Sequence, residues 1–95
     1  MEIPDFAKKA MARGIDEPEA LSLHHYITRG DPLGGFLSAV MSNQLVEAYS
    51  KADNHNRQHM EAYAFFLFND APMDCWGSPE AVQEWAHKGG LLGTA

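Results

Sequence analysis

The sequence has a single cysteine, few basic residues and no long apolar run, and each shortage excludes a class of protein. Cys75 stands alone, so an intramolecular disulfide is impossible. The longest apolar run, Ala62–Phe68, is far too short to span a bilayer. Met1–Ala12 is polar and charged and lacks the apolar segment of a secretory signal. We therefore expect a cytoplasmic protein that does not enter a membrane.

Basic residues are outnumbered by acidic ones, and the imbalance limits the partners. The chain has 7 Lys and Arg against 13 Asp and Glu, a net charge of −6 with neutral histidines. The only basic cluster consists of Lys8, Lys9 and Arg13. Binding to nucleic acid or to anionic membrane surfaces needs a larger basic patch. The composition instead favours a soluble domain that attracts basic protein partners.

The 95 residues, 45% of them apolar, predict one globular domain over residues 1–95 with one small core. No segment alternates apolar and polar residues for long enough to predict a strand. Residues typical of helix N-termini, together with glycines that end helices, instead predict an all-α, compact bundle of five to six short helices with no sheet. Residues 1–4 and 91–95 are expected to fray. The expected helices are Asp5–Arg13, Asp16–Arg29, Phe36–Ser42, Gln44–Lys51, Asn54–Phe68 and one that follows the Ser78-Pro79-Glu80 start and ends at Gly89. In the second of these helices the spacing predicts a buried stripe of Ala20, Leu23 and Ile27, with Tyr26 beside it. In the fourth helix we expect the apolar residues to be buried, namely Leu45, Val46, Ala48 and Tyr49.

The strongest helical pattern lies in Asn54–Phe68, behind an expected cap at Asp53. We expect this segment to be the central, most buried helix, with three phenylalanines widening its apolar face. Because a small monomer lacks the elements to cover all of them, the pattern favours a homodimer over a monomer. The predicted core stripe follows the i, i+3, i+4, i+7 spacing of one helix face and consists of Met60, Tyr63, Ala64 and Leu67.

No catalytic or metal-binding constellation assembles in the sequence. His55 and His59 have the i, i+4 spacing of metal ligands, but the chain lacks the further ligands that a structural zinc site needs. Both are expected on the solvated side of their helix. Cys75 next to Trp76 is typical of a small packed residue rather than of a nucleophile. We therefore predict no enzyme activity, no cofactor and no metal.

Two segments are candidate binding sites. Gly34 and Gly35 precede a helix, with Arg29 upstream, so backbone N–H groups there could hold a phosphate. The pattern is shorter than the known phosphate-cradling motifs, and a tight turn between helices accounts for it better.

The second candidate is the loop between the last two expected helices, which we favour as a partner-binding site. It holds Asp70, Met73, Asp74 and Trp76. Trp76 could anchor a partner, with Met73 as an adaptable neighbour and the two aspartates as a rim that steers a basic surface. The alternative is that Trp76 packs against Trp85 and fixes the last helix.

Three segments resemble small, mostly uncharacterised phage and prophage proteins. They are Pro32–Asn43 (PLGGFLSAVMSN), Ala52–Asn56 (ADNHN) and Asn69–Pro79 (NDAPMDCWGSP). The similarity covers roughly residues 24 to 86, and the Cys-Trp-Gly-Ser element is its most specific part. It implies an accessory protein made by a phage in the cytoplasm of its bacterial host, and it assigns no particular catalytic or binding residue.

Three functions remain open from the sequence. The leading one is a module that binds and modulates a host bacterial protein, including inhibition of a defence system. The second is sequestration of a phosphorylated small ligand or nucleotide at Arg29, Gly34 and Gly35. The third is a structural or assembly component of a phage particle.

Overall fold

The computed structural model describes residues 5–93, and over these residues the all-α prediction is confirmed. No strand occurs within them, but the helices number seven rather than five or six, with two additional 3-10 turns. Residues 1–4 and 94–95, expected to fray, lie outside the described residues. The elements are α1 (Asp5–Ala12), α2 (Glu17–Arg29), α3 (Gly35–Met41), α4 (Leu45–Lys51), α5 (Asn54–Gln58), α6 (Met60–Asn69), η1 (Met73–Cys75), α7 (Pro79–Lys88) and η2 (Gly90–Leu92).

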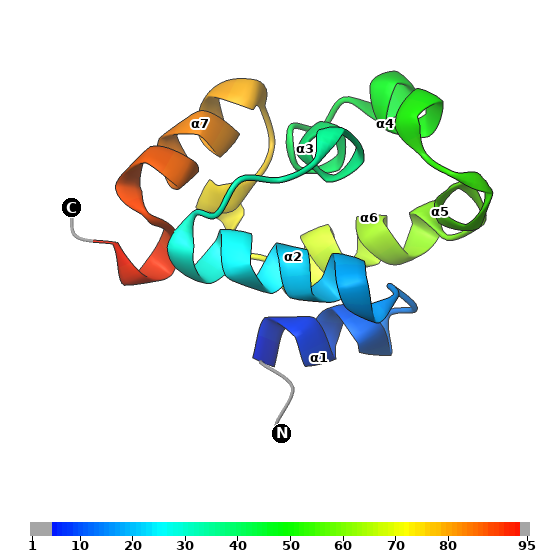
Figure 1. The fold of residues 1–95 in the computed structure, drawn as a ribbon, viewed down its shortest axis with the longest axis horizontal. Coiled ribbons are helices and arrows are strands. Elements are labelled where there is room, and N and C mark those ends of the chain that lie inside the picture. Colours follow the sequence, from blue (N-terminus) through cyan, green and yellow to red (C-terminus); the bar gives the residue numbers. More distant parts are fainter. Residues whose placement is uncertain (1–4, 94–95) are drawn as a thin grey trace.

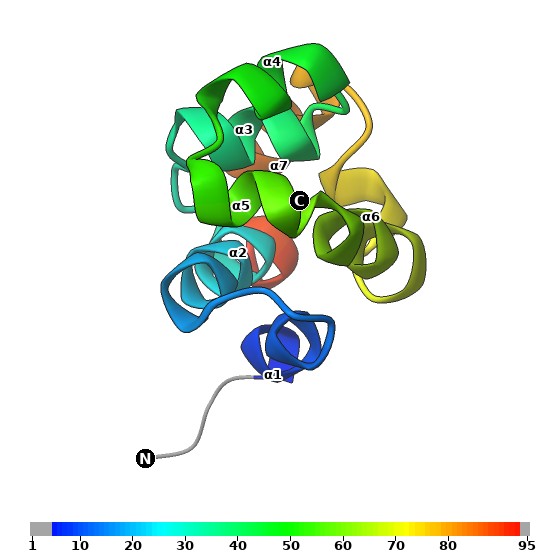
Figure 2. The ribbon, with the colours of Figure 1, turned by 90° about the vertical axis from the view of Figure 1, so that its right-hand side faces the viewer.

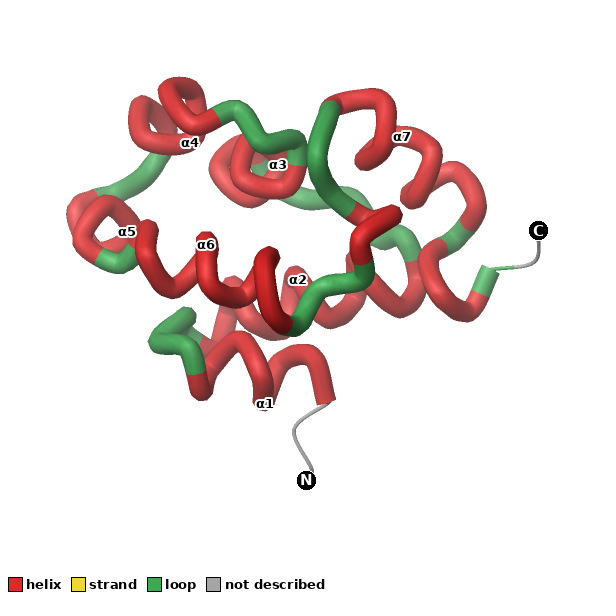
Figure 3. Tube along the Cα trace, turned by 180° about the vertical axis from the view of Figure 1, so that it is seen from behind, coloured by secondary structure: helices red, strands yellow, loops and turns green. Residues whose placement is uncertain are grey.

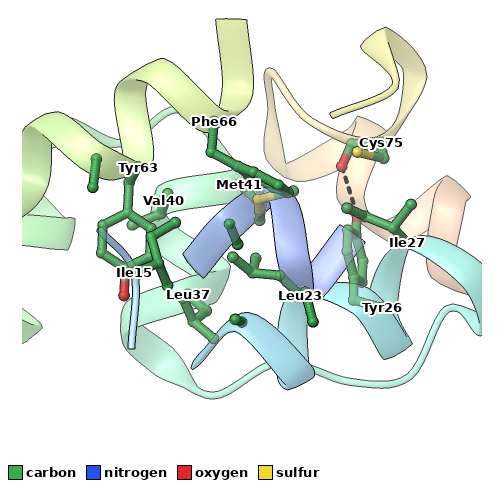
Figure 4. Close-up of a cluster of buried hydrophobic side chains, with 14 of the residues drawn as sticks. Ile15, Leu23, Tyr26, Ile27, Leu37, Val40, Met41, Tyr63, Phe66 and Cys75 are labelled. Atoms are coloured by element: carbon green, nitrogen blue, oxygen red, sulfur yellow. Dashed lines mark hydrogen bonds between the residues drawn. The ribbon is translucent and has the colours of Figure 1, made fainter. Parts of the chain in front are cut away.

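Helix α2 lies at the centre of three layers. It runs beside α6, with α1 below the pair and α3, α4 and α7 above it (Figures 1 and 2). The buried face of α2 is the one predicted from its spacing, and it packs against Met41 and Phe66 from the neighbouring helices (Figure 4). α2, and not Asn54–Phe68, therefore occupies the centre of the fold. Its buried residues are Ala20, Leu23, Tyr26 and Ile27.

The predicted helix Asn54–Phe68 is wrong in one respect, because it breaks at His59 into α5 and α6. The Asp53 side chain accepts from the Asn56 backbone N–H at 2.7 Å and starts α5. His59 leaves the helical conformation (φ −118°, ψ 20°), and its backbone N–H reaches back only three residues, to Asn56. The buried Asn56 side chain accepts from the Tyr63 hydroxyl at 3.2 Å and holds the two helices at an angle.

The break turns α6 relative to the predicted stripe. Of the four residues expected in the core, only Tyr63 is buried. Met60 and Leu67 are half-buried, and Ala64 is exposed. The buried residues of α6 are Ala62, Tyr63 and Phe66. α6 is apolar on all sides, so the spacing alone did not distinguish the face that packs from the faces that do not.

Helix α7 begins and ends as its sequence predicts. The Ser78 hydroxyl accepts from the Ala81 N–H at 3.1 Å, and Gly89 ends the helix in the left-handed conformation. The indole N–H of Trp85 donates to the carbonyls of Tyr26 and Ile27, both at 3.1 Å. Beyond Gly89, residues 91 and 92 of the tail that was expected to fray lie in η2, which contacts α2.

Candidate protein-binding groove

A groove opens between α4 and α6, with part of α3 between them. The backbones of α3, α4 and α6 are seen from behind in Figure 3. The groove has a volume of about 310 Å³. We call this feature the α4–α6 groove. Most of its lining is apolar, and the turn Asn43-Gln44 contributes two amides at one end. Its lining residues are Ala39, Val40, Asn43, Gln44, Leu45, Ala48, Tyr49, Met60, Glu61, Tyr63, Ala64 and Leu67.

The same two helices carry most of the exposed large apolar side chains among residues 5–93. Five of the eight lie on α4 or α6, and Val46 and Phe68 are more than four-fifths exposed (82% and 83%). Single exposed apolar residues are ordinary, but a group of them beside a groove marks an interaction site. The five are Leu45, Val46, Tyr49, Phe65 and Phe68.

This surface also corrects the sequence prediction for Gln44–Lys51. We expected Leu45, Val46, Ala48 and Tyr49 to be buried, but only Ala48 is. α4 has seven residues, and its apolar side chains point in more than one direction, so one packing face cannot cover them all. A short helix that is apolar on several sides was the signal in the sequence that could have located this groove.

Among residues 5–93, Glu61 is the only charged residue that lines the groove. Within the described part of the chain, its carboxylate forms no ion pair within 4 Å, whereas the nearby Glu47 is paired with Lys51 at 3.0 Å. A carboxylate at the edge of an apolar groove favours a cation brought by whatever binds there. The groove therefore combines an apolar lining with one fixed negative charge.

The predicted loop site is split by the structure. Met73 and Asp74 lie at the surface in η1, with Met73 85% exposed. Asp70 forms an ion pair with Arg13 at 2.9 Å, and Trp76 is half-buried against the core. Trp76 and Trp85 form no ring pair among residues 5–93. The loop thus presents Met73 and Asp74, without the exposed aromatic anchor that was expected beside them.

Cys75 explains why the loop is held in place. The Cys75 side chain is fully buried, and its backbone carbonyl accepts from the Tyr26 hydroxyl at 2.7 Å (Figure 4). Two residues later, the Gly77 N–H donates to the Met41 carbonyl at 2.8 Å. Burial raises the pKa of the Cys75 thiol to about 12. A thiol with this pKa is protonated at neutral pH and is a poor nucleophile.

At the predicted anion site, Gly34 and Gly35 form the start of α3, a helix of seven residues. Arg29 is paired with Asp31 at 2.6 Å. A Cβ on Gly34 would meet nothing within 4 Å, and one on Gly35 would meet only the Lys51 side chain, whose Cδ lies at 3.4 Å. The turn therefore resembles an ordinary entry into a short helix.

The two histidines with i, i+4 spacing, His55 and His59, contact other groups of the protein. His55 Nε2 lies 2.8 Å from an Asp16 carboxylate oxygen, and His59 Nδ1 lies 2.8 Å from the His55 carbonyl. Their rings are 4.3 Å apart between centroids. Over residues 5–93, no three His, Cys, Asp or Glu side chains are grouped so that they could hold a metal ion.

Comparisons with protein-family models, with curated proteins and with solved structures gave no match. Across the described helices, none is both long enough and apolar enough to cross a membrane.

Proposed function

We propose that this protein is a binding module that docks onto another protein through the α4–α6 groove. The observation that carries the proposal is the groove itself, an apolar depression whose lining includes the exposed side chains of Leu45 and Tyr49. Apolar surface of this kind is costly to leave in water, and burying it against a partner is favourable. The chemistry of Cys75 agrees with a binding role, because its buried thiol is unsuited to catalysis.

The proposed partner is a protein of the bacterial host, bound in the host cytoplasm. The choice of a bacterial host protein as partner rests on the resemblance of Pro32–Asn43 and Asn69–Pro79 to phage and prophage proteins. Small phage accessory proteins often act by occluding a host protein, including components of defence systems. The net charge of −6 supports a protein partner over nucleic acid, because phosphates would be repelled.

The groove fits the other two functions less well. Its lining contains no cation, so it offers a phosphorylated ligand or nucleotide nothing to neutralise the phosphate. A role in assembling a phage particle would bury the same surface against another particle protein. Affinity capture distinguishes particle assembly from binding to a host protein by the identity of the captured protein.

Affinity capture from bacterial lysate with mass spectrometry tests the proposal. Three variants that each put a glutamate at an exposed apolar position locate the contact: Leu45→Glu at the groove, Met73→Glu in the loop and Leu92→Glu on η2. Their wild-type side chains are 65%, 85% and 75% exposed, so the substitutions change charge equally and disturb the core little.

We expect Leu45→Glu to abolish capture of a host protein that wild type and Leu92→Glu both retain. Selective loss with Met73→Glu would move the site to the loop. Absence of any host protein enriched over the tag alone would refute the proposed function.

A further inference from the structure

We infer that the occupant of the α4–α6 groove is an amphipathic helix whose apolar side enters the groove and whose flanking lysine or arginine pairs with Glu61. The inference rests on the proposed function and names the kind of partner segment that this site takes.

The shape of the groove favours a helix. Its long walls are themselves helices, α4 and α6, and the lining residues of α6 run from Met60 to Leu67. The seven residue steps from Met60 to Leu67 rise about 10 Å along the helix axis, which is about two turns. A partner helix laid along such a groove places side chains spaced i, i+3 and i+4 into it. The volume of about 310 Å³ suits a small number of large apolar side chains.

The charge of the groove favours a basic flank on that helix. Glu61 lies at the groove with no ion-pair partner within the described residues, and no lysine, arginine or histidine is among the lining residues. An occupant that covered Glu61 without supplying a cation would bury an unpaired carboxylate, which is unfavourable. A basic side chain at this point removes that cost and selects the partner.

The charge of the groove also disfavours a second copy of the chain, the homodimer expected from the sequence. A second copy that presented the same groove would bring its own Glu61 and a further net charge of −6. Like charges brought together at an interface are destabilising. The groove and the homodimer compete for one surface, so one set of measurements decides between them.

The test uses synthetic helical peptides of 14 residues as probes. One has leucines at helical spacing with lysines on the flanks, and the second is identical except that glutamates replace the lysines. Fluorescence anisotropy of each labelled peptide gives its affinity for wild type, for Glu61→Lys and for Glu80→Lys. Glu80 is an exposed residue of α7 outside the groove, so its variant is the matched control for the change in total charge.

We expect the lysine peptide to bind wild type and Glu80→Lys alike, and to bind Glu61→Lys at least about tenfold more weakly. The glutamate peptide should bind Glu61→Lys better than wild type, because the charges are then exchanged. Equal losses with Glu61→Lys and Glu80→Lys would mean that only net charge matters, and this would overturn the inference.

Three further results overturn the inference in distinguishable ways. If light scattering gives twice the chain mass and Leu45→Glu restores the monomer, the occupant is a second copy. If a host protein is captured through Leu45 but the lysine peptide binds wild type and Glu61→Lys with equal affinity, the proposed function stands. The inferred basic helix is then wrong. If neither host protein nor peptide binds, the proposed function fails as well.

Discussion

The hydroxyl of Tyr26 donates a hydrogen bond of 2.7 Å to the backbone carbonyl of Cys75. The two residues are 49 positions apart, and both side chains are buried. The bond joins the central helix α2 to the loop between α6 and α7. Because a buried carbonyl without a partner is costly, this contact fixes the loop that the sequence marked as a binding site. The loop is therefore part of the packed framework of the protein.

Removing this hydrogen bond is expected to destabilise the protein. Tyr26→Phe leaves the Cys75 carbonyl buried without its donor, which costs about 1–3 kcal/mol of unfolding free energy. Tyr49→Phe is the matched control, because Tyr49 is exposed in the groove and loses only a solvated hydroxyl. Urea unfolding followed by circular dichroism measures both. Equal stability of the two variants would show that the Tyr26 bond contributes nothing.

Cys75 is expected to make stability fall at high pH. Burial raises the pKa of its thiol to about 12, above the value of an unfolded cysteine near 9. The neutral thiol therefore contributes stability that is fully present below pH 9 and is lost as the pH rises toward 12. Cys75→Ala removes this contribution, so its unfolding free energy should decline less steeply over that range than that of wild type.

The same burial predicts slow reaction of Cys75 with thiol reagents. At pH 8, an aromatic disulfide reagent should react with native protein only at the rate of transient opening, and rapidly after unfolding in urea. Reaction of the native protein as fast as that of the unfolded protein would contradict the buried position.

Gly30 is expected to resist substitution at the end of α2. It has a φ of +75°, and a Cβ there would lie 2.8 Å from the backbone oxygen of Ala86 in α7. Gly30→Ala therefore combines a strained backbone with a clash between two helices, at a cost of more than about 1 kcal/mol. Gly34→Ala is the control, since its Cβ would meet nothing within 4 Å. Thermal unfolding should separate the two variants clearly, and similar melting temperatures would argue against this packing.

Two phenylalanines of α6 are expected to behave oppositely. Phe66 is fully buried, so Phe66→Ala should cost about 3–5 kcal/mol. Phe68 is 83% exposed, and Phe68→Ala should change stability by no more than about 0.5 kcal/mol. Chemical unfolding of both variants checks the orientation of α6. A large loss with Phe68→Ala and a small one with Phe66→Ala would contradict this orientation of α6.

The residues at which helices begin and end could be predicted from the sequence, and so could the buried face of α2. These features depend on local chemistry. Ser78 before Pro79, and the glycines at 30 and 89, act through the backbone of their own helix. The break at His59 could not be predicted in this way. It depends on the buried pair of Asn56 and Tyr63, whose contact exists only after the chain has folded. A period of 3.6 residues continues through such a break without a visible change.

The groove could not be predicted from the sequence for a related reason. Leu45 and Tyr49 were read as core residues because apolar side chains are usually buried, and nothing local to α4 indicates which of them α3 and α6 leave uncovered. The loop residues Met73 and Asp74 are exposed, as a recognition site requires, and their role in binding stays a prediction. Asp70 and Trp76 are engaged with Arg13 and with the core, contacts that lie far away in the sequence.

The central claim is that the α4–α6 groove is the surface that binds a partner. The most direct test is a titration of isotopically labelled protein with the lysine-flanked helical peptide, followed by amide chemical shifts in NMR spectra. The account predicts the largest shifts in Leu45–Lys51 and Met60–Leu67, saturating together, with η1 and α7 unchanged. Shifts centred on Met73–Cys75, or spread evenly over the acidic surface, would contradict it.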